Sequence, residues 1–347
     1  MLSKLSFMND SKTKISIIFP SYNGEKFLCK NLKSIQQLSN LNEIELVIVD
    51  NNSNDSTKEI IKSFNHKINI TLIEQESNLG FAKACNIGVF NAKGKYIFIT
   101  NQDVIFPEDF FKIILFVYHH YKKDQNIIVC PAIVFPDNTI NYFGAKIHFL
   151  GFSYTTQMYQ KIKATTTTFK TQKISGCSML IKKKKFLELN GFDPYFFMYQ
   201  EDTDFSLRAN RHHMSIYTTN ETILIHQKDH FILNAFTYYY IERNRYLCLF
   251  KNIDNLKDLI PYLIISELML LVQAILTKQL KIRFKIYKFL IQNYQNIKYL
   301  RINKSNSKTK KIRKYQLSSK LDSIVLGKSL FNNKLLKKIL KIVNFIF

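Results

Sequence analysis

Tyr96-Ile-Phe-Ile-Thr-Asn-Gln-Asp103 is an apolar run that ends in polar side chains and a carboxylate. A short apolar run with such an end predicts a buried strand over residues 96–100. Open α/β sheets bind ligands just beyond the carboxyl ends of their strands, which is where Asp103 would lie. Asp103 is therefore a candidate for binding a metal ion or a phosphate. The alternative is a polar turn leading to Pro107, because Asn and Asp are common where strands stop.

Strands and helices alternate through the first third of the chain. β-Branched and apolar runs predict strands at 15–19, 45–49, 70–74 and 96–100, and helical spacing predicts helices at about 27–35, 56–64 and 81–90. Such alternation implies right-handed crossovers, an α/β fold and a mainly parallel sheet flanked by helices. Further along, residues 135–173 suggest irregular loops or short hairpins. A strand is predicted again at 178–181, before the charged run at 182–185 that we interpret as a solvated helix start.

Composition narrows the class of partner. The chain has 347 residues and a formal net charge of +24, which favours an anionic partner such as nucleic acid, anionic lipid or a phosphorylated small molecule. Five scattered cysteines without a C-x-x-C pair argue against a disulfide framework or a zinc cluster and favour a reducing compartment. Residues 1–14 contain no long apolar segment of the kind found in secretory signals. We therefore expect a cytoplasmic protein.

The chain changes character after about Asp254. Residues 259–276 are strongly apolar but include Pro261 and Glu267, and a bilayer span needs about 20 predominantly apolar residues. This composition favours a helix at a membrane interface or against a partner over a true span. Residues 335–347 have the pattern of a basic amphipathic helix that lies on an anionic membrane. The alternative is a C-terminal helix that buries its apolar side on the protein itself.

Four polar clusters follow predicted strands or precede a predicted helix. They are residues 20–23, 50–53, 77–80 and 101–103. The carboxyl ends of parallel strands meet at one edge of a sheet, so we expect these clusters to converge on one crevice. Gly80 would allow close approach to a ligand at the start of a helix, where free amides suit phosphate. The chain has no Walker P-loop and no G-x-G-x-x-G after the first strand, which weakens ATPase and dehydrogenase interpretations.

A second concentration of carboxylates lies at residues 200–204. If a helix begins there, Glu201 and Asp202 occupy its first turn, where acidic groups are favoured and where capping alone would explain them. Aromatic residues at 196–199 can desolvate a neighbouring carboxylate and make it more basic, as a general base requires. An ion pair between Asp204 and Arg208, four residues apart on the helix, is slightly favoured over a phosphate contact by Arg208.

Taken together, these stretches resemble the inverting family 2 glycosyltransferases of the GT-A fold, and within them a bacterial rhamnosyltransferase-like branch. The resemblance covers about residues 15–250, with Tyr240–Arg245 also similar and the rest of the tail matched only in character. It implies a catalytic domain over 1–253, with a nucleotide-binding half at about 15–105 and an acceptor half at about 106–253. Residues 254–347 would form a basic helical extension, associated with a membrane. The matching stretches are 16–23, 47–53, 78–88, 101–103, 191–193 and 197–204.

The resemblance implies a role for each matching residue. Asp50 would read a pyrimidine base, and the nucleotide-sugar would contact Pro20, Tyr22, Asn23, Asp50, Asn52, Asn78, Gly80, Lys83, Asn101 and Gln102. Asp103 would be the last carboxylate of the D-x-D element that binds Mg²⁺ or Mn²⁺ on the diphosphate. The chain departs from that element at Asn101 and Gln102. His226 is a candidate for the missing ligand, and a polar histidine at a strand end is the equal alternative.

Asp202 would be the general base, with Glu201 as the alternative base and Asp204 and Arg208 in support. The implied reaction moves a sugar from dTDP-rhamnose or a UDP-sugar to a lipid-linked or polysaccharide acceptor, with inversion, in O-antigen- or capsule-like biosynthesis. We expect a peripheral position at the inner face of the cell membrane. One alternative is a weakly active relative that serves as a scaffold. A nucleic-acid-binding module, suggested by basic and aromatic residues at 287–315, would explain the charge but not the polar clusters, so no nucleic acid is expected.

Overall fold

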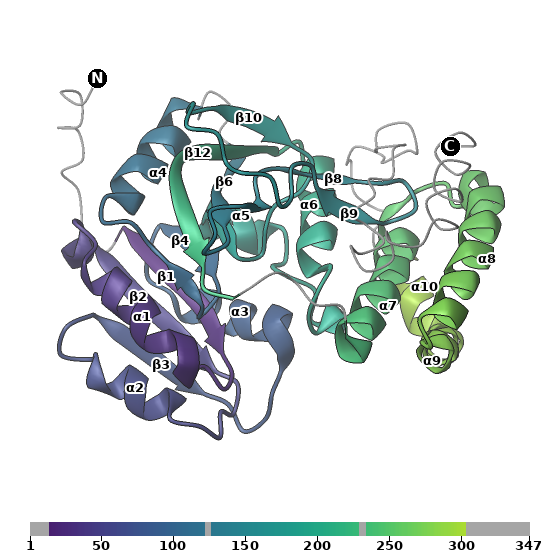
Figure 1. Ribbon diagram of the computed structural model, residues 1–347, viewed down its shortest axis with the longest axis horizontal. Coiled ribbons are helices and arrows are strands. Elements are labelled where there is room, and N and C mark those ends of the chain that lie inside the picture. The colour runs from purple at the N-terminus through teal and green to yellow at the C-terminus, as the bar shows by residue number, and fades with distance from the viewer. Residues whose placement is uncertain (1–13, 122–125, 229–233, 303–347) are drawn as a thin grey trace.

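The computed structural model describes residues 14–121, 126–228 and 234–302. A curved ten-stranded sheet forms the centre, and a group of helices from the C-terminal part lies at one end of the molecule (Figure 1). The predicted amphipathic segment at 335–347 lies outside the described residues, as does the part of 287–315 beyond residue 302. The α/β architecture with a C-terminal helical extension is confirmed.

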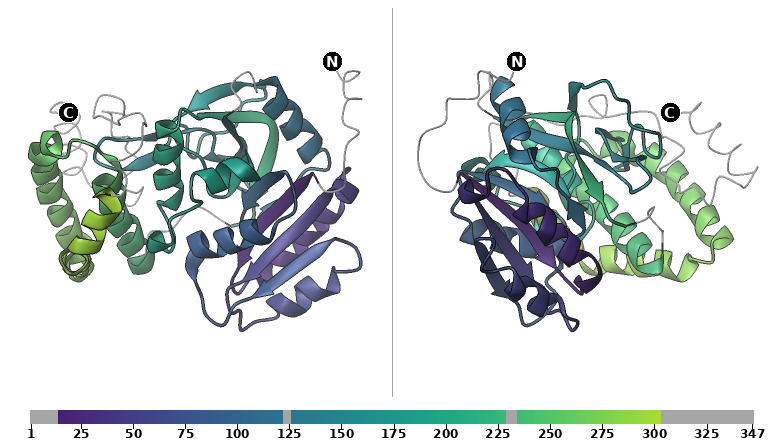
Figure 2. Two further views of the ribbon diagram at one scale, coloured as in Figure 1. Left: turned by 180° about the vertical axis from the view of Figure 1, so that it is seen from behind. Right: turned by 60° about the vertical axis from the view of Figure 1, so that its left-hand side comes forward.

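The first half of the sheet is parallel. Its strands lie in the order β3-β2-β1-β4, with α1 and α2 on one face and α3 on the other (Figures 1 and 2). The strands predicted at 70–74 and 96–100 have those bounds in the structure. The elements are β1 (Ile15–Ser21), α1 (Glu25–Gln36), a 3₁₀ turn η2 (Leu41–Glu43), β2 (Ile44–Asp50), α2 (Thr57–Ser63), β3 (Ile70–Glu74), α3 (Gly80–Asn91) and β4 (Tyr96–Thr100).

The second half departs from the mainly parallel expectation. β11 lies between β4 and β6 and runs antiparallel to both, whereas β6 and β12 are parallel. The predicted short hairpins at 135–173 are present. The elements are β5 (Val104–Ile105), α4 (Phe110–His120), β6 (Ile127–Val134), β7 (Ile140–Tyr142), β8 (Ala145–Ile147), β9 (Ser153–Thr155), β10 (Thr168–Thr171), β11 (Ser178–Lys182), α5 (Lys183–Glu188), η3 (Pro194–Phe196), α6 (Glu201–Arg211) and β12 (Ser215–His226).

All five residues of β4 are buried, as the opening stretch predicts. Phe98 contacts the rings of Phe106, Phe110 and Phe111 edge to face, at centroid distances of 5.0–5.9 Å. Aromatic rings prefer this geometry over direct stacking, and such pairs add to the stabilisation from buried area. The cluster holds the segment after Asp103 against the sheet, so the carboxyl end of β4 is firmly anchored.

The C-terminal helices are joined through buried charges. Arg283 on α9 is fully buried, and its Nη1 donates to Oε2 of Glu242 on α7 at 2.6 Å. Arg245, also fully buried, donates from Nη2 to the same oxygen at 3.0 Å. Burial opposes ionisation of Glu242, but the two guanidinium groups outweigh it and keep the pKa of Glu242 below its ordinary value. The helices are α7 (Ala235–Asn252), η4 (Lys257–Leu259), α8 (Ile260–Leu276), α9 (Leu280–Gln292) and α10 (Tyr294–Ile302).

Among the described residues, one helical stretch is long and apolar enough to cross a membrane. It covers Lys257–Leu276, 20 residues, and 28% of its most apolar part is buried inside the protein. The apolar segment predicted at 259–276 is therefore helical and largely unburied.

Candidate active site

Gln102 connects the loop after β4 to the loop after β1. Its Oε1 accepts a hydrogen bond from Ser21 Oγ at 2.6 Å and from the Tyr22 backbone N–H at 3.2 Å, while its Nε2 donates to the Tyr22 carbonyl at 3.2 Å. Tyr22 is 44% exposed, close to Pro20 at the end of β1. Gln102 therefore fixes the backbone that presents Tyr22, a task that a shorter Asp side chain at this position would perform poorly.

The loops after β1 and β2 are also bonded to each other. The Asn23 N–H donates to Ser53 Oγ at 3.0 Å, and Asn23 Oδ1 accepts from the Asn54 N–H at 2.9 Å. Both Asp50 oxygens accept from Ser53, at 2.5 Å from Oγ and 3.1 Å from the N–H. Asn23 and Asn52 adopt left-handed backbone angles, φ 46° and 65°, which Asn tolerates better than most residues. The expected clusters thus meet at one sheet edge.

The start of α3 is built differently from the sequence expectation. Asn78 Oδ1 accepts from the Gly80 N–H at 2.9 Å, and Gly80 has φ +77°. The group that approaches Gly80 is Phe197, whose side-chain and carbonyl atoms lie 2.5 Å from the position of a Cβ at residue 80. A side chain there would displace Phe197, so packing alone requires the glycine. Lys83 is exposed, one turn further along α3.

Asp103 is 99% buried, yet neither of its carboxylate oxygens accepts a hydrogen bond of good geometry within the described residues. Its neighbours are ionic instead. Lys228 Nζ lies 2.9 Å from Oδ2, and His226 Nε2, at the end of β12, lies 3.4 Å from Oδ1. A buried carboxylate is costly unless cations compensate it, and Lys228 supplies one of them. The acceptor capacity that both oxygens retain keeps Asp103 a candidate ligand for a metal ion at the sheet edge.

His226 and Asp103 fit a divalent ion that shares its coordination with a ligand. Burial lowers the pKa of His226, although Asp103 opposes the shift, so the ring is neutral near pH 7 and can bind a metal. Residues 14–121, 126–228 and 234–302 contain no group of three or more His, Cys, Asp or Glu that could hold an ion. Mg²⁺ in enzymes often takes only one or two carboxylates and completes its shell with phosphates and water. The pair therefore suits a nucleotide-dependent metal site.

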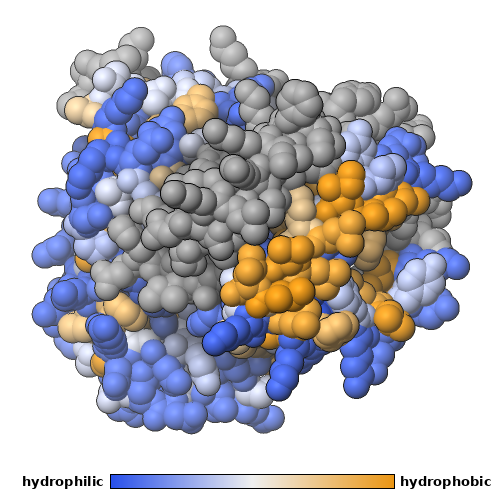
Figure 3. All heavy atoms as spheres, turned by 45° about the vertical axis from the view of Figure 1, so that its right-hand side comes forward, coloured by the Kyte–Doolittle hydropathy of each residue, from blue (hydrophilic) through white to orange (hydrophobic). Residues whose placement is uncertain are grey.

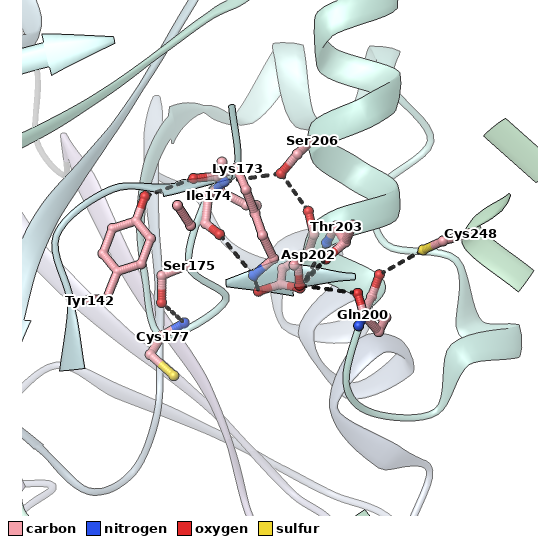
Figure 4. Close-up of polar contacts among 12 residues, drawn as sticks. Tyr142, Lys173, Ile174, Ser175, Cys177, Gln200, Asp202, Thr203, Ser206 and Cys248 are labelled. Atoms are coloured by element: carbon pink, nitrogen blue, oxygen red, sulfur yellow. Dashed lines mark hydrogen bonds and ion pairs between the residues drawn. The ribbon is translucent and has the colours of Figure 1, made fainter. Parts of the chain in front are cut away.

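Asp202 lies in the first turn of α6 and faces a lysine from a neighbouring loop (Figure 4). Lys173 Nζ is 2.5 Å from Asp202 Oδ2, and Oδ1 accepts from the Thr203 N–H at 2.7 Å. The Lys173 backbone is itself anchored, because Tyr142 Oη donates to its carbonyl at 2.8 Å. This contact orients an anionic carboxylate, the form that a general base must have.

Glu201, beside Asp202, is 95% buried, and its Oε2 has no hydrogen-bond partner among the described residues. Burial raises the pKa of Glu201 well above its ordinary value, and the charge of Asp202 raises it further. A carboxyl group that is protonated near neutral pH cannot accept a proton. Glu201 is also closed off by its burial, whereas the Asp202 side chain is 16% exposed, so the geometry favours Asp202 of the two carboxylates predicted as the base.

Glu201→Gln tests this protonation. Because the folded-state pKa is raised, the unfolded chain ionises first, and wild-type stability falls as the pH rises from about 4.5 toward the folded-state pKa. Gln removes this loss, so we expect the melting temperature of the variant, relative to wild type, to increase by a few degrees from pH 5 to pH 8. Thermal melts at both pH values measure it. A constant difference would contradict the raised pKa.

Asp204 and Arg208 hold α6 in place. Arg208 Nε donates to Asp204 Oδ2 at 2.8 Å, which confirms the predicted helix pair. The other Arg208 nitrogens donate to the carbonyls of Leu189 and Gly191, so each guanidinium nitrogen makes a hydrogen bond within the protein. Asp204 is completely buried, and although burial opposes ionisation, Arg208 and Lys251 hold the pKa of Asp204 far below its ordinary value. Both residues support the site without an obvious ligand contact.

The segment 173–177 joins the Asp103 and Asp202 clusters. Asn101 Nδ2 donates to Cys177 Sγ at 3.0 Å, and Thr100 Oγ1 donates to the Cys177 carbonyl at 2.9 Å. Burial raises the pKa of the Cys177 thiol, and nearby carboxylates from both clusters raise it further: Asp103, Asp202 and Glu201. One end of this segment therefore contacts the end of β4, while Lys173 at the other end holds Asp202 (Figure 4).

A family model described as "Glycosyl transferase family 2" matches residues 16–189, half of the 347-residue chain. The chain belongs to glycosyl transferase family 2. The matched region contains β1–β4, Asp103 and the 173–177 segment. A second model, described as the N-terminal domain of galactosyltransferase, matches residues 156–230 and so includes α6 and His226.

The chain is similar to proteins that are named as glycosyltransferases. An uncharacterized glycosyltransferase of Haemophilus influenzae is 30% identical over 200 residues, which are 56% of this chain and 61% of the relative. The Staphylococcus aureus poly(ribitol-phosphate) beta-N-acetylglucosaminyltransferase TarS is 32% identical over 112 residues, 31% of this chain and 20% of that protein. GalNAc-T7, solved with UDP, GalNAc and Mn2+, shares the fold with a TM-score of 0.57 at 16% identity, over 72% of this chain and 50% of that one. The chain spans 20–61% of the length of the first curated relatives it matches.

Sequence reasoning missed Lys173 in this family 2 chain. The residue lies in a stretch rich in Thr and Lys that predicts only loops, and lysines there are ordinarily solvated. The one feature of the sequence that could have indicated a buried position for Lys173 is that an apolar residue, Ile174, follows it directly. Only the fold reveals that the Lys173 side chain is 13% exposed and paired with Asp202.

Proposed function

We propose that this family 2 glycosyltransferase moves a sugar from a pyrimidine nucleotide-sugar to a glycan or lipid-linked acceptor, with inversion at the anomeric carbon. The observation that carries the proposal is that segment 173–177 connects the surroundings of two carboxylates. Asn101, two residues before the buried Asp103, contacts Cys177 at one end, and Lys173 at the other end holds Asp202. One carboxylate suits the diphosphate side of a donor. The other suits the acceptor side.

The proposed reaction is a single displacement at the anomeric carbon, in which Asp202 is the residue that accepts a proton. The acceptor oxygen forms a bond to the anomeric carbon as the bond from that carbon to the diphosphate oxygen breaks, and Asp202 takes the acceptor hydroxyl proton. Inversion follows because attack and departure occur on opposite faces of the sugar. Lys173 keeps the Asp202 carboxylate oriented toward this task. Within the scheme, Asp50 and Tyr22 contact the base and Asn78 and Lys83 lie near the phosphates.

A divalent ion would be held by Asp103 and His226 together with the donor diphosphate. When bound, Mg²⁺ or Mn²⁺ would stabilise the negative charge that develops on the departing diphosphate. GalNAc-T7 shares this fold and was solved with Mn2+, which supports such an ion here. Asn101 stands where the D-x-D element has its first carboxylate, and it contacts Cys177 instead; Gln102, at the middle position, contacts the Tyr22 loop. Asp103 therefore supplies the carboxylate contribution of this element.

The relatives support a cell-surface polymer as the acceptor. TarS is named for poly(ribitol-phosphate), and GgaB of Bacillus subtilis is named a minor teichoic acid biosynthesis protein. We extend this to O-antigen- or capsule-like polysaccharide, with dTDP-rhamnose or a UDP-sugar as donor. No nucleic acid is involved in this scheme.

A panel of nucleotide-sugars tests the function directly. Purified protein is incubated with UDP-, dTDP- and GDP-sugars and Mn²⁺, and release of the nucleoside diphosphate is measured with and without glycan acceptors. We expect turnover of a UDP- or dTDP-sugar. Selective use of a GDP-sugar would contradict the role of Asp50 in reading a pyrimidine, and inactivity with every donor would favour the scaffold alternative.

An exposed apolar stripe on α8 supports a peripheral position at the inner face of the membrane. Figure 3 shows apolar side chains gathered into one patch on the face formed by the C-terminal helices. Exposed lysines lie at both ends of α8 and on α9: Lys257, Lys278, Lys281 and Lys285. An apolar stripe with cationic neighbours is typical of helices that lie on anionic lipid. The stripe consists of Ile260, Ile264, Leu268, Val272, Ile275 and Leu276.

Leu268→Glu is expected to weaken binding to vesicles that contain phosphatidylglycerol by about tenfold. The change removes apolar area that the lipid would bury, and it adds a negative charge that the anionic lipid repels. Leu268 is 61% exposed, so the fold has no need of it. Vesicle sedimentation measures the effect. The matched control is Phe90→Glu on α3, an 80% exposed aromatic outside the stripe. Equal binding of both variants and wild type would remove the α8 stripe from membrane contact.

A further inference from the structure

The loop before α6 has an unfavourable backbone. Phe197, Tyr199 and Gln200 all have left-handed angles, with φ of 65°, 64° and 68°. Non-glycine residues rarely adopt such angles, and three within four residues persist only when the surroundings enforce them. Gln200 is the residue that immediately precedes the first turn of α6, so this loop sets where Glu201 and Asp202 begin.

One side chain on α7 binds most of this loop. Asn244 is fully buried, and the two N–H groups of its Nδ2 are shared among three carbonyls: those of Phe196 at 2.9 Å, Met198 at 2.8 Å and Tyr199 at 2.7 Å. Its Oδ1 is used separately and accepts from Arg243 Nε at 2.8 Å. Buried carbonyls require partners, and the Asn244 amide is the side-chain donor that the structure gives to the carbonyls of Met198 and Tyr199. The amide nitrogen of Asn244 therefore stabilises the unusual conformation of this loop.

Arg243 extends the same support to α9. Its Nη2 donates to the Phe196 carbonyl at 2.8 Å, and its guanidinium lies 4.8 Å from the centre of the Phe289 ring on α9. Tyr195 Oη donates to Asn293 Oδ1 at 2.7 Å. Helices far from the sheet edge thus reach the loop through specific contacts.

The loop also contacts the nucleotide-binding half. The Phe197 carbonyl accepts from the Ala82 N–H in the first turn of α3 at 3.1 Å, and its ring fills the space left by Gly80. The Phe197 ring stacks on Tyr240 of α7 at a centroid distance of 5.1 Å. Phe197 therefore lies between α3 and α7, and the position of the loop affects both halves of the candidate site.

We propose that Asn244 is a positioning residue for sugar transfer, which acts by holding the 197–200 loop and through it the first turn of α6. The proposal rests on the proposed function for the role of Asp202. Asn244 itself touches no ligand. Its loss shifts the base relative to the acceptor, and misplacement of a reacting group by about 1 Å can reduce turnover about 100-fold.

Asn244→Asp isolates the contact. Asp has the same size as Asn and retains an oxygen that can accept from Arg243. It replaces the amide nitrogen, which faces the three carbonyls, with an oxygen that can only accept. The matched control is Asn86→Asp on α3, because Asn86 Nδ2 donates to the single Phe192 carbonyl at 2.6 Å, outside the loop. Both changes leave a carbonyl without its side-chain donor, so both lower the stability of the fold. Only Asn244→Asp also releases the 197–200 loop.

We expect kcat for the preferred donor to fall about 100-fold in Asn244→Asp, with an unchanged donor KM, and to stay near the wild-type value in Asn86→Asp. Hydrogen–deuterium exchange should be faster at residues 198–204 in Asn244→Asp alone. Wild-type kcat together with wild-type exchange would overturn the proposal. If wild type itself is inactive on every donor, the proposed function fails, and the exchange measurement still decides whether Asn244 holds the loop.

Discussion

Asp202→Asn is expected to lower kcat for sugar transfer by about 10²- to 10⁴-fold, the range that general base catalysis contributes. The amide keeps the shape of the side chain but cannot take the acceptor proton. Donor KM should be unchanged, because Asp202 lies on the acceptor side of the proposed reaction. Initial rates at saturating donor, over a range of acceptor concentrations, measure the effect.

The control must separate catalysis from loss of an ion pair. Asp202 pairs with Lys173 at 2.5 Å, and Asp254 pairs with Arg211 at 2.6 Å outside the candidate site. Asp254→Asn therefore removes a comparable contact without removing the base. We expect it to retain wild-type kcat. If Asp202→Asn were as active as this control, Asp202 would not be the base and Glu201 would have to be reconsidered.

Asp103→Asn should have the second largest effect, a loss of about 10²- to 10³-fold in kcat/KM at saturating Mn²⁺. The carboxylate is buried with unused acceptor capacity, and the isosteric amide halves the oxygens available to a cation and removes the charge. Wild type treated with EDTA should show a comparable loss, whereas EDTA should change the variant little. Donor hydrolysis with and without Mn²⁺ measures all four conditions.

Asp109→Asn is a suitable control for the Asp103 experiment, because Asp109 is exposed and its nearest cation, Lys112, is 3.9 Å away. It should match wild type with and without EDTA. An active Asp103→Asn variant would remove Asp103 from the mechanism. Donor hydrolysis by the wild-type protein, with or without Mn²⁺, would exclude the scaffold alternative. Asn101 and Gln102, where the chain departs from the D-x-D element, otherwise leave that alternative open.

Local pattern was sufficient to predict the first half of the fold. β4 is bounded by a lysine-rich turn and by Asn101, so its five buried residues are legible in the sequence. The parallel order of β1–β4 follows from short strand–helix–strand units, whose crossover is sterically restricted to one hand. The convergence of the polar clusters then follows from geometry, since parallel strands end at the same edge.

The pairing of strands that are distant in the chain, in the second half of the sheet, was harder to predict from the sequence. β11 pairs with β4 across about 80 residues and runs antiparallel to it, and no periodicity in the sequence encodes that direction. Asn244 and Lys173 were missed for a related reason. Polar residues ordinarily indicate solvent, yet Glu242–Arg245 is buried because each member finds a partner contributed by a distant element. Burial of this kind is a property of the assembled fold.

The two buried arginines have a consequence for how this chain can evolve. Glu242 on α7 and Glu267 on α8 together compensate Arg245 on α7 and Arg283 on α9, so none of these three helices can be exchanged by recombination without leaving an uncompensated charge in the interior. The exposed side chains of these helices lie outside this network and are free to diverge. Arg283 is not free to diverge, and we expect the three helices to be inherited as a single unit.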